Sequence, residues 1–181
     1  MKRHKFFETK RLLIRPTTKE DAGFIFELMT SEKWLSNIGS RGLQTEKDAL
    51  IYIRQKMLPQ LERLGFSNYT IIRKTDGAKM GSCGLYDREG LEGIDIGYAL
   101  LEQYERMGYA FEAASRIKQA AFEDFLFTEL YAITTHENIS SQRLLEKLGM
   151  TWKTSVHISN DPNELRLYQL SVDNISGSEI R

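Results

Sequence analysis

Hydrophobic residues along this chain follow two different spacings, and the change from one to the other predicts alternating strands and helices. Short apolar or alternating runs, typical of β-strands, occupy about seven segments: residues 11–15, 68–73, 80–86, 94–101, 130–135, 151–158 and 164–172. Runs spaced by three to four residues, typical of amphipathic helices, occupy four: one through residues 24–28, then 46–64, 108–126 and 140–148. This order predicts an α/β fold, with a mixed sheet and helices on both faces.

Residues at the helix ends support these boundaries. Thr45 and Asp48 have the spacing of a capping box at the start of the helix over residues 46–64. Pro59 should kink or end that helix, because proline lacks the N–H group and its ring clashes with the preceding turn. Gly149 follows the helix of residues 140–148 where a left-handed residue is expected.

Composition narrows the class of protein. The 181 residues fit one domain, which we place at residues 8–172, followed by a polar tail at 173–181. Twenty-five basic and 25 acidic residues give a formal net charge of zero, which argues against a nucleic-acid partner. The single cysteine, Cys83, excludes an internal disulfide framework, and no apolar run is long enough for a signal peptide or a membrane span. We therefore expect a cytoplasmic protein, a monomer or homodimer, without a membrane partner.

Candidate chemistry lies where the strand at 94–101 gives way to the helix at 108–126. Backbone N–H groups at a helix start have no acceptor within the helix, and the helix dipole adds positive charge there. Gly108 would let a phosphate approach the backbone, although a glycine here is also compatible with a simple tight turn. Asn138 and Ser140 begin the next helix, where capping alone is the alternative interpretation. Both helix starts should lie beyond the strand ends at one edge of the sheet, as one bipartite site.

Four segments, in order and on the expected elements, resemble the GNAT N-acetyltransferases, in particular the ribosomal-protein alanine and serine N-acetyltransferases. They are Glu8-Thr9-Lys10-Arg11-Leu12-Leu13-Ile14-Arg15-Pro16, Ile96-Gly97-Tyr98, Gly108-Tyr109-Ala110-Phe111-Glu112-Ala113, and Asn138-Ile139-Ser140-Ser141 with Glu146-Lys147-Leu148-Gly149. The resemblance covers nearly the whole chain. It implies a mostly antiparallel sheet in which one parallel pair splays apart to bind acyl-CoA.

The resemblance also implies roles for particular residues. The backbone of Tyr98, Ala99 and Leu100 would pair with the pantetheine arm of acetyl-CoA, Asn138 would hydrogen-bond that arm, and Ser141 would lie near the thioester sulfur. The pyrophosphate would be held by backbone amides of one loop: Glu105, Arg106, Met107, Gly108, Tyr109 and Ala110. The chain departs from the family twice. Arg106 replaces the first glycine of the phosphate loop, and Leu145 stands where many relatives have a tyrosine acid.

Amine acetylation requires a neutral amine, a polarised carbonyl and a proton for the leaving sulfur. We expect the Tyr98 N–H to polarise the carbonyl as an oxyanion-hole donor, and Ser141 to serve the sulfur unless it is only a helix residue. Asp95 is the candidate base, with Glu89, Glu92 and His136 as alternatives. Cys83 is interpreted as a small strand residue, and we expect direct attack without an acyl-enzyme.

The acceptor is not fixed by the sequence. A protein N-terminal amine and a small amine, such as an antibiotic, polyamine or amino acid, both remain open, as does a non-catalytic CoA-binding sensor. Five side chains are candidates for acceptor contact: Trp34, Tyr52, Trp152, His157 and Tyr168. The three histidines lack metal-ligand spacing, so we propose no metal site.

Overall fold

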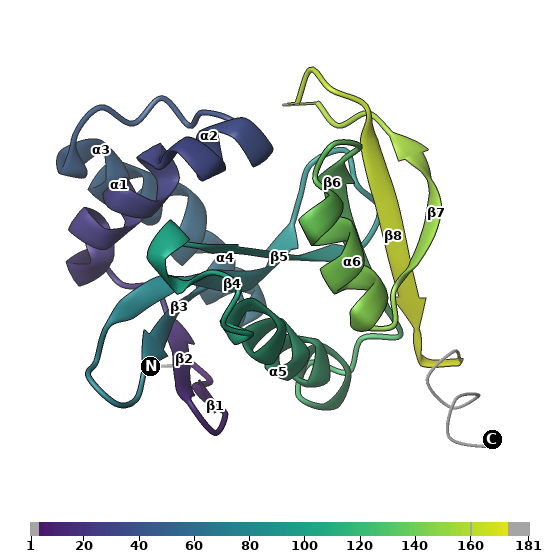
Figure 1. Ribbon diagram of the computed structural model, residues 1–181, viewed down its shortest axis with the longest axis horizontal. Coiled ribbons are helices and arrows are strands. Elements are labelled where there is room, and N and C mark those ends of the chain that lie inside the picture. The colour runs from purple at the N-terminus through teal and green to yellow at the C-terminus, as the bar shows by residue number, and fades with distance from the viewer. Residues whose placement is uncertain (1–3, 160, 174–181) are drawn as a thin grey trace.

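The computed structural model describes residues 4–159 and 161–173, and its centre is a single sheet of eight strands (Figure 1). The strands in chain order are β1 (Phe7–Glu8), β2 (Leu12–Pro16), β3 (Asn68–Arg73), β4 (Lys79–Asp87), β5 (Ile94–Leu100), β6 (Glu129–Thr135), β7 (Thr151–Val156) and β8 (Leu165–Ser171). Their spatial order is β1-β2-β3-β4-β5-β6-β8-β7. Every neighbouring pair is antiparallel except β5 with β6. The mixed, mostly antiparallel sheet predicted from the sequence is confirmed.

The eighth strand is β1, which the sequence did not reveal. It contains two residues, Phe7 and Glu8, that pair with Ile14 and Leu13 of β2. Two residues are too few for a hydrophobic period to be detected. Pairing with β2, together with the burial of the Phe7 ring, is what defines this strand.

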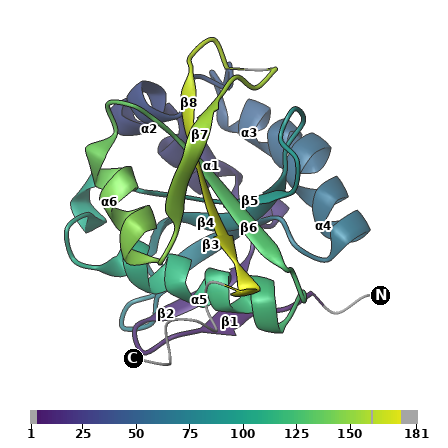
Figure 2. The ribbon, with the colours of Figure 1, turned by 90° about the vertical axis from the view of Figure 1, so that its right-hand side faces the viewer.

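Within the described residues, α-helices α1 to α6 lie on the two faces of the sheet, α1 to α4 on one and α5 and α6 on the other (Figures 1 and 2). The helical elements are η1 (Lys19–Asp21), α1 (Ala22–Thr30), α2 (Glu32–Asn37), α3 (Glu46–Tyr52), η2 (Ile53–Met57), α4 (Leu58–Leu64), η3 (Glu102–Tyr104), α5 (Tyr109–Glu123) and α6 (Ile139–Lys147). The sequence predicted four helices. The additional ones are α2, a short helix that begins at the Ser31 N-cap, and α4, which continues α3.

The helix predicted at residues 46–64 is present as α3, η2 and α4, and its expected capping box is confirmed. The Thr45 hydroxyl accepts from the Asp48 N–H, and the Thr45 N–H donates to the Asp48 carboxylate at 2.8 Å. Pro59 neither ends nor breaks the helix. Instead, the five residues before α4 form a π-turn, in which the Leu58 N–H donates to the Ile53 carbonyl. A wider turn before Pro59 relieves the clash that its ring would make in a regular helix.

Each face of the sheet carries its own hydrophobic core. The larger core lies under α5 and α6, where four alanines of α5 are fully buried: Ala113, Ala114, Ala120 and Ala121. These small side chains let α5 cross β4 and β5 closely. The smaller core joins α1, α3 and η2 through Ile25, Met29 and Ile53.

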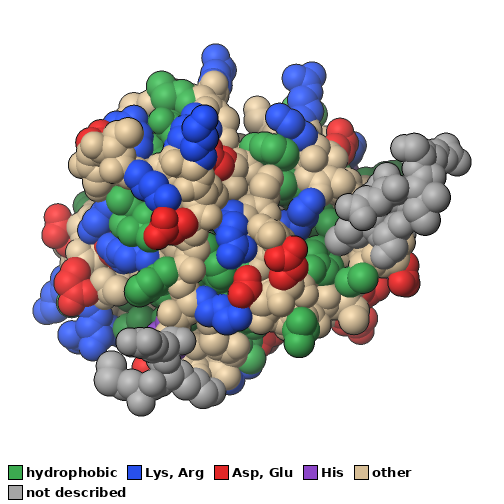
Figure 3. Space-filling model, turned by 90° about the horizontal axis from the view of Figure 1, so that it is seen from below, with side chains coloured by type: hydrophobic (Ala, Val, Ile, Leu, Met, Phe, Trp, Pro, Cys, Tyr) green, Lys and Arg blue, Asp and Glu red, His purple; other side chains and the backbone are tan. Residues whose placement is uncertain are grey.

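The surface and the ends of the chain add little to this architecture. Seen from below, basic and acidic side chains are interspersed rather than gathered into one field (Figure 3), in agreement with the balanced charge of the sequence. None of the helices in the described residues has the length and apolar character to cross a membrane. The predicted polar tail lies outside the described residues beyond Asp173.

Candidate functional site

The two parallel strands at the centre of the sheet separate along most of their length. β5 and β6 each contain seven residues, yet Asp95 with Tyr131 is their one pair in register. By contrast, β5 is in continuous register with β4 from Ile94 to Leu100. The edge of β5 that faces β6 therefore has backbone groups without a strand partner, which a ligand with amide groups can engage as an additional strand would.

The backbone of Tyr98 points into this gap. The Leu101 N–H donates to the Met80 carbonyl at 2.8 Å, which continues the β4–β5 ladder. In an antiparallel pair the N–H groups of alternate residues face the same neighbour. The N–H groups of Ala99 and Leu101 thus face β4, and that of Tyr98, which is expected from the sequence to be an oxyanion-hole donor, faces the gap.

The loop between β5 and α5 presents a series of free amides. No acceptor for the N–H groups of residues 106–111 lies within the part of the chain that is described, and the first helical bond runs from Glu112 N–H to the Gly108 carbonyl. Gly108 has a φ of 80°, so its exposed backbone turns the chain into α5 without a side chain over the amides. Glu105 differs from the expectation, because its N–H already donates to the Glu102 carbonyl at 3.1 Å.

Arg106, which replaces the family's glycine, adopts a glycine conformation. Its φ is 59°, in the left-handed region that residues with a Cβ rarely occupy. The side chain is exposed. The loop therefore keeps the shape that a glycine would give it and adds a cation beside the free amides.

On the other side of the gap, Asn138 is the N-cap of α6, as its interpretation as a helix-capping residue predicts. The Asn138 side-chain oxygen accepts from the Ser141 N–H at 3.1 Å. Its amide nitrogen has no acceptor among the described residues, so a donor remains available for a ligand in the gap. Capping and ligand binding are thus compatible at Asn138.

Tyr98 and Ser141 bridge the two sides of the gap. The phenol of Tyr98 donates to the Ser141 hydroxyl oxygen at 3.0 Å, although one residue lies on β5 and the other in the first turn of α6. Burial raises the pKa of Tyr98 to about 12, against the hydrogen bond to Ser141. The phenol is therefore protonated at neutral pH and acts as a donor. Leu145, in place of the family tyrosine, is buried in the core.

Asp95 is on the opposite face of the sheet from the Tyr98 side chain, since the two lie an odd number of positions apart on the same strand and successive side chains alternate between faces. It is 1% exposed, and both carboxylate oxygens accept from Arg88, at 2.9 and 3.1 Å. Burial raises the pKa of the Asp95 carboxyl, and the Arg88 guanidinium opposes that rise. Sequence reasoning missed Arg88, because nothing in the residue pattern relates a loop arginine to a strand carboxylate seven positions later.

The remaining candidates fall into two groups. Tyr168 is wholly buried in the larger core and is not available to an acceptor, whereas the Trp152 ring is 55% exposed on the edge strand β7. Glu89 and Glu92 are exposed. Burial raises the pKa of the Cys83 thiol, which agrees with its interpretation as a small strand residue.

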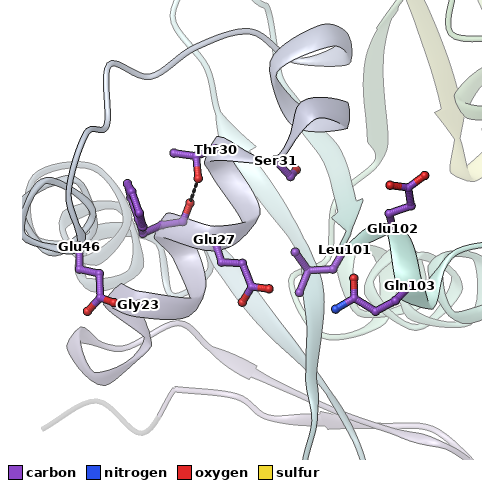
Figure 4. Close-up of a pocket in the computed structure, with 9 residues that line it drawn as sticks. Gly23, Glu27, Thr30, Ser31, Glu46, Leu101, Glu102 and Gln103 are labelled. Atoms are coloured by element: carbon purple, nitrogen blue, oxygen red, sulfur yellow. Dashed lines mark hydrogen bonds between the residues drawn. The ribbon is translucent and has the colours of Figure 1, made fainter.

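A groove of about 700 Å³ opens beside the end of β5, between that strand and helices α1 and α3. Glu27 of α1 points across it toward Leu101 and Gln103, and Glu46 lies beside Gly23 (Figure 4). Glu102 completes a lining that contains three exposed carboxylates and no basic side chain. The sequence did not indicate this groove, because its residues come from three separate segments.

Comparisons with known proteins agree with this geometry. A family model described as an acetyltransferase (GNAT) domain matches residues 11–151. The uncharacterized N-acetyltransferase YnaD of Bacillus subtilis (strain 168) is 29% identical over 142 residues, which are 78% of this chain and 80% of the relative.

Solved structures share the fold. RimL, a ribosomal L7/L12 alpha-N-protein acetyltransferase in complex with coenzyme A, superposes with a TM-score of 0.79 at 13% identity, covering 94% of this chain and 99% of that one. The ribosomal-protein-S5-alanine acetyltransferase from Vibrio fischeri superposes with a TM-score of 0.75 at 17% identity, over 93% and 97% of the two chains.

Proposed function

Because the chain belongs to the GNAT acetyltransferase family, it is an acyltransferase, and we propose that it transfers acetyl from acetyl-CoA to a primary amine by direct attack. The observation that carries this proposal is the gap between β5 and β6, with free amides of residues 106–111 at one end and the Tyr98–Ser141 contact across it. When bound, acetyl-CoA would supply the activated acetyl group.

The residues around the gap fit this co-substrate. Amides of Arg106 to Ala110 would hold the pyrophosphate, supported by the partial positive charge of the α5 start. The free edge of β5 at Tyr98 and Leu100 would pair with the amides of the pantetheine arm, and the unpaired Asn138 nitrogen would donate to them. We leave Ala99 out of this edge, because its N–H faces β4. We leave Glu105 out of the amide set, because its N–H is already bonded.

In the chemical step, the Tyr98 N–H would polarise the thioester carbonyl, because it points into the gap. The amine nitrogen forms a bond to the acetyl carbon, the carbon–sulfur bond breaks, and the sulfur needs a proton. Ser141 would donate that proton from its hydroxyl, Tyr98 would replace it through the 3.0 Å hydrogen bond, and solvent would return a proton to the Tyr98 phenolate before the next turnover. This pair takes the place of the family tyrosine that Leu145 has replaced.

Asp95 remains our candidate for the base, acting on the α1–α4 side of the sheet and together with Arg88. Its carboxylate faces the side of the sheet that carries α1 to α4, where the groove of Glu27 and Glu46 also lies. Burial makes it a stronger base than a solvated aspartate. Each carboxylate oxygen accepts one hydrogen bond from Arg88 and keeps a second lone pair that could take the ammonium proton, so the step would involve both residues.

For the acceptor we propose a protein N-terminal amine. The support is structural similarity to acetyltransferases of ribosomal proteins and an open groove that an extended peptide can enter. A second candidate, a small polycationic amine, is favoured by the three carboxylates of that groove, which would attract a second positive charge.

The experiment that tests these proposals is a measurement of thiol release from acetyl-CoA with a panel of N-terminal peptides and small amines. Release with alanine- or serine-initiated peptides, and not with polyamines, supports the first acceptor, and the reverse supports the second. If CoA binds in a direct titration but no amine gives thiol release, the result would support a non-catalytic CoA-binding sensor and contradict the proposed enzymatic activity.

A further inference from the structure

Arg11 lies directly beside the phosphate loop, although it is 96 positions from Met107 in the sequence. It precedes β2, in the segment that also contains Thr9. Its Nη1 donates to the Met107 carbonyl at 3.0 Å, and its guanidinium lies over the Tyr109 ring at 4.3 Å. Arg11 thus contacts the residues on both sides of Gly108.

Glu112, in the first turn of α5, holds this arginine in place. Its carboxylate accepts from Arg11 Nε at 2.6 Å, from the Arg11 N–H at 3.0 Å and from the Thr9 hydroxyl at 2.6 Å. Burial opposes ionisation of Glu112, but these three donors outweigh it and lower its pKa. The carboxylate is therefore charged, and it uses Nε rather than the terminal nitrogens of the guanidinium.

The remaining nitrogen of Arg11, Nη2, faces the open side of Gly108. A Cβ at Gly108 would lie 3.3 Å from Nη2, with no other neighbour within 4 Å. Nη2 has no hydrogen-bond acceptor within residues 4–159 and 161–173. A shallow groove of about 570 Å³ begins here and continues along α5 past Phe111 and Ser115. A charged donor is thus fixed beside the phosphate loop and faces an open groove.

We propose that Arg11 contacts the pyrophosphate of CoA through Nη2, and that Glu112 is the positioning residue that presents it. This inference rests on the proposed function and extends its phosphate site to a residue outside the loop. The guanidinium adds a charge-assisted bond that the backbone amides cannot supply. It stands in addition to the exposed Arg106, which has no fixed partner to orient it within the described residues.

The test compares ligands that contain the pyrophosphate with one that lacks it. For Arg11→Gln, we expect the Kd of CoA in a direct titration to rise by about tenfold or more, the loss typical of one hydrogen bond to a charged group. The Kd of 3′-dephospho-CoA should rise equally. The kcat/KM for S-acetylpantetheine, which ends before the pyrophosphate, should stay within about twofold of the wild type.

Matched variants separate charge from folding. Arg63 of α4 forms an exposed ion pair with Asp87 at the end of β4. Arg63→Gln removes the same charge there and should leave the values for all three ligands unchanged. Arg11→Lys should fall between wild type and Arg11→Gln, because it keeps the charge without the fork. Glu112→Gln should weaken CoA binding less than Arg11→Gln does.

Two results would overturn the inference. An equal loss of kcat/KM with S-acetylpantetheine would mean that Arg11 has a structural role only. A rise in Kd for CoA without one for 3′-dephospho-CoA would mean that Arg11 contacts the 3′-phosphate and not the pyrophosphate. Wild-type protein that binds none of these ligands would instead contradict the proposed function itself, so the two failures are distinguishable.

Discussion

In the proposed mechanism, Tyr98 and Ser141, two residues from different elements, would together replace one missing side chain. The family tyrosine would project from α6, where this chain buries Leu145. Here the phenol comes from β5 instead, and it reaches α6 through the Ser141 hydroxyl. Under this proposal the proton for the sulfur would come through a two-residue chain, and the contribution of each residue to kcat can be measured separately.

For Ser141→Ala we expect kcat to fall by about 100-fold, and for Tyr98→Phe by about tenfold, at the lower end of general-acid contributions. The Kd of CoA should change little in both variants, because neither hydroxyl is proposed to hold the co-substrate. Steady-state kinetics with the best amine of the panel provides the measurement. Ser140→Ala, an exposed neighbour in the same turn, is the control. An unchanged kcat in Ser141→Ala would reduce this serine to a helix residue.

Arg106 offers a test of backbone strain at a single position. Its φ of 59° costs roughly 1 kcal/mol for a residue with a Cβ. Glycine removes that cost, but it gains a similar conformational entropy in the unfolded chain. We therefore expect Arg106→Gly to change the free energy of unfolding by less than about 1 kcal/mol, and Arg106→Val to lower it by about 1–2 kcal/mol. Urea denaturation of both variants measures the difference, and an equal effect of the two substitutions would contradict the strain.

At the scale of elements, the pairing of β4 with β5 sets the position of the free strand edge. A Cβ at Gly81 would lie 2.2 Å from the Ala99 carbonyl oxygen, which belongs to the backbone and has no room to move. Gly81→Ala should therefore push β5 away from β4, lower the free energy of unfolding by about 2–3 kcal/mol and weaken CoA binding.

The control for Gly81→Ala is a glycine in a helix. Gly23 lies in α1, where an added Cβ would meet the flexible end of Glu46 at 3.3 Å. Gly23→Ala should raise the free energy of unfolding by up to about 1 kcal/mol, because alanine is the better helix former. Urea denaturation measures both variants. A Gly81→Ala protein as stable as the wild type would mean that the two strands tolerate the extra carbon.

Elements long enough to show a hydrophobic repeat were predictable from the sequence, whereas elements that depend on contacts with other segments were not. The alanine stripe identified α5, and the Thr45–Asp48 box identified the start of α3. The two-residue β1 has no period of its own, and the π-turn before Pro59 is a response to geometry that a residue pattern does not carry. Predicted bounds differed from the observed ones by a few residues in either direction: β7 ends at Val156 and not at residue 158, whereas β4 extends from Lys79 to Asp87, beyond the predicted 80–86.

At the scale of the whole molecule, the sequence predicted the backbone part of the site better than its side chains. Gly108 and Asn138 follow from helix starts at fixed places in the chain. Arg11, Arg88 and the Tyr98 phenol act through contacts between segments up to about one hundred residues apart, and a single sequence contains no signal for such contacts. The opening segment that carried the family resemblance includes Arg11 and Thr9, but resemblance alone gave them no role.

The ion pairs of Asp21 connect η1 to the sheet and predict how stability depends on pH. The carboxylate is fully buried and lies 2.7 Å from Arg15 and 2.6 Å from Lys79. Burial raises its pKa, but these cations and the Thr18 N–H outweigh burial and hold the pKa well below the usual range. A depressed folded pKa means that the contribution is complete above the unfolded value, near 3.9, and is lost as the pH falls below it.

Asp21→Asn should therefore lower the free energy of unfolding by about 3 kcal/mol at pH 7, because it leaves two cations without their partner. The difference between wild type and variant should shrink as the pH falls below about 4. Urea denaturation from pH 7 to pH 3 measures this difference. A gap of the same size at both ends of that range would exclude the ionised carboxylate as its source.

The single registered pair between β5 and β6 divides the sheet into two panels, with five strands in one and three in the other. Within each panel the neighbouring strands are paired, with register shifts only at Ile71/Ile72 and at Trp152/Thr154, but across the seam the backbone contributes almost nothing. A ligand lying between β5 and β6 would supply the hydrogen bonds that are missing between these two strands. The stability of the junction between the two panels would then depend on whether the ligand is bound. Amide hydrogens along the free edge of β5 at Tyr98 should therefore exchange slowly only in the ligand-bound protein.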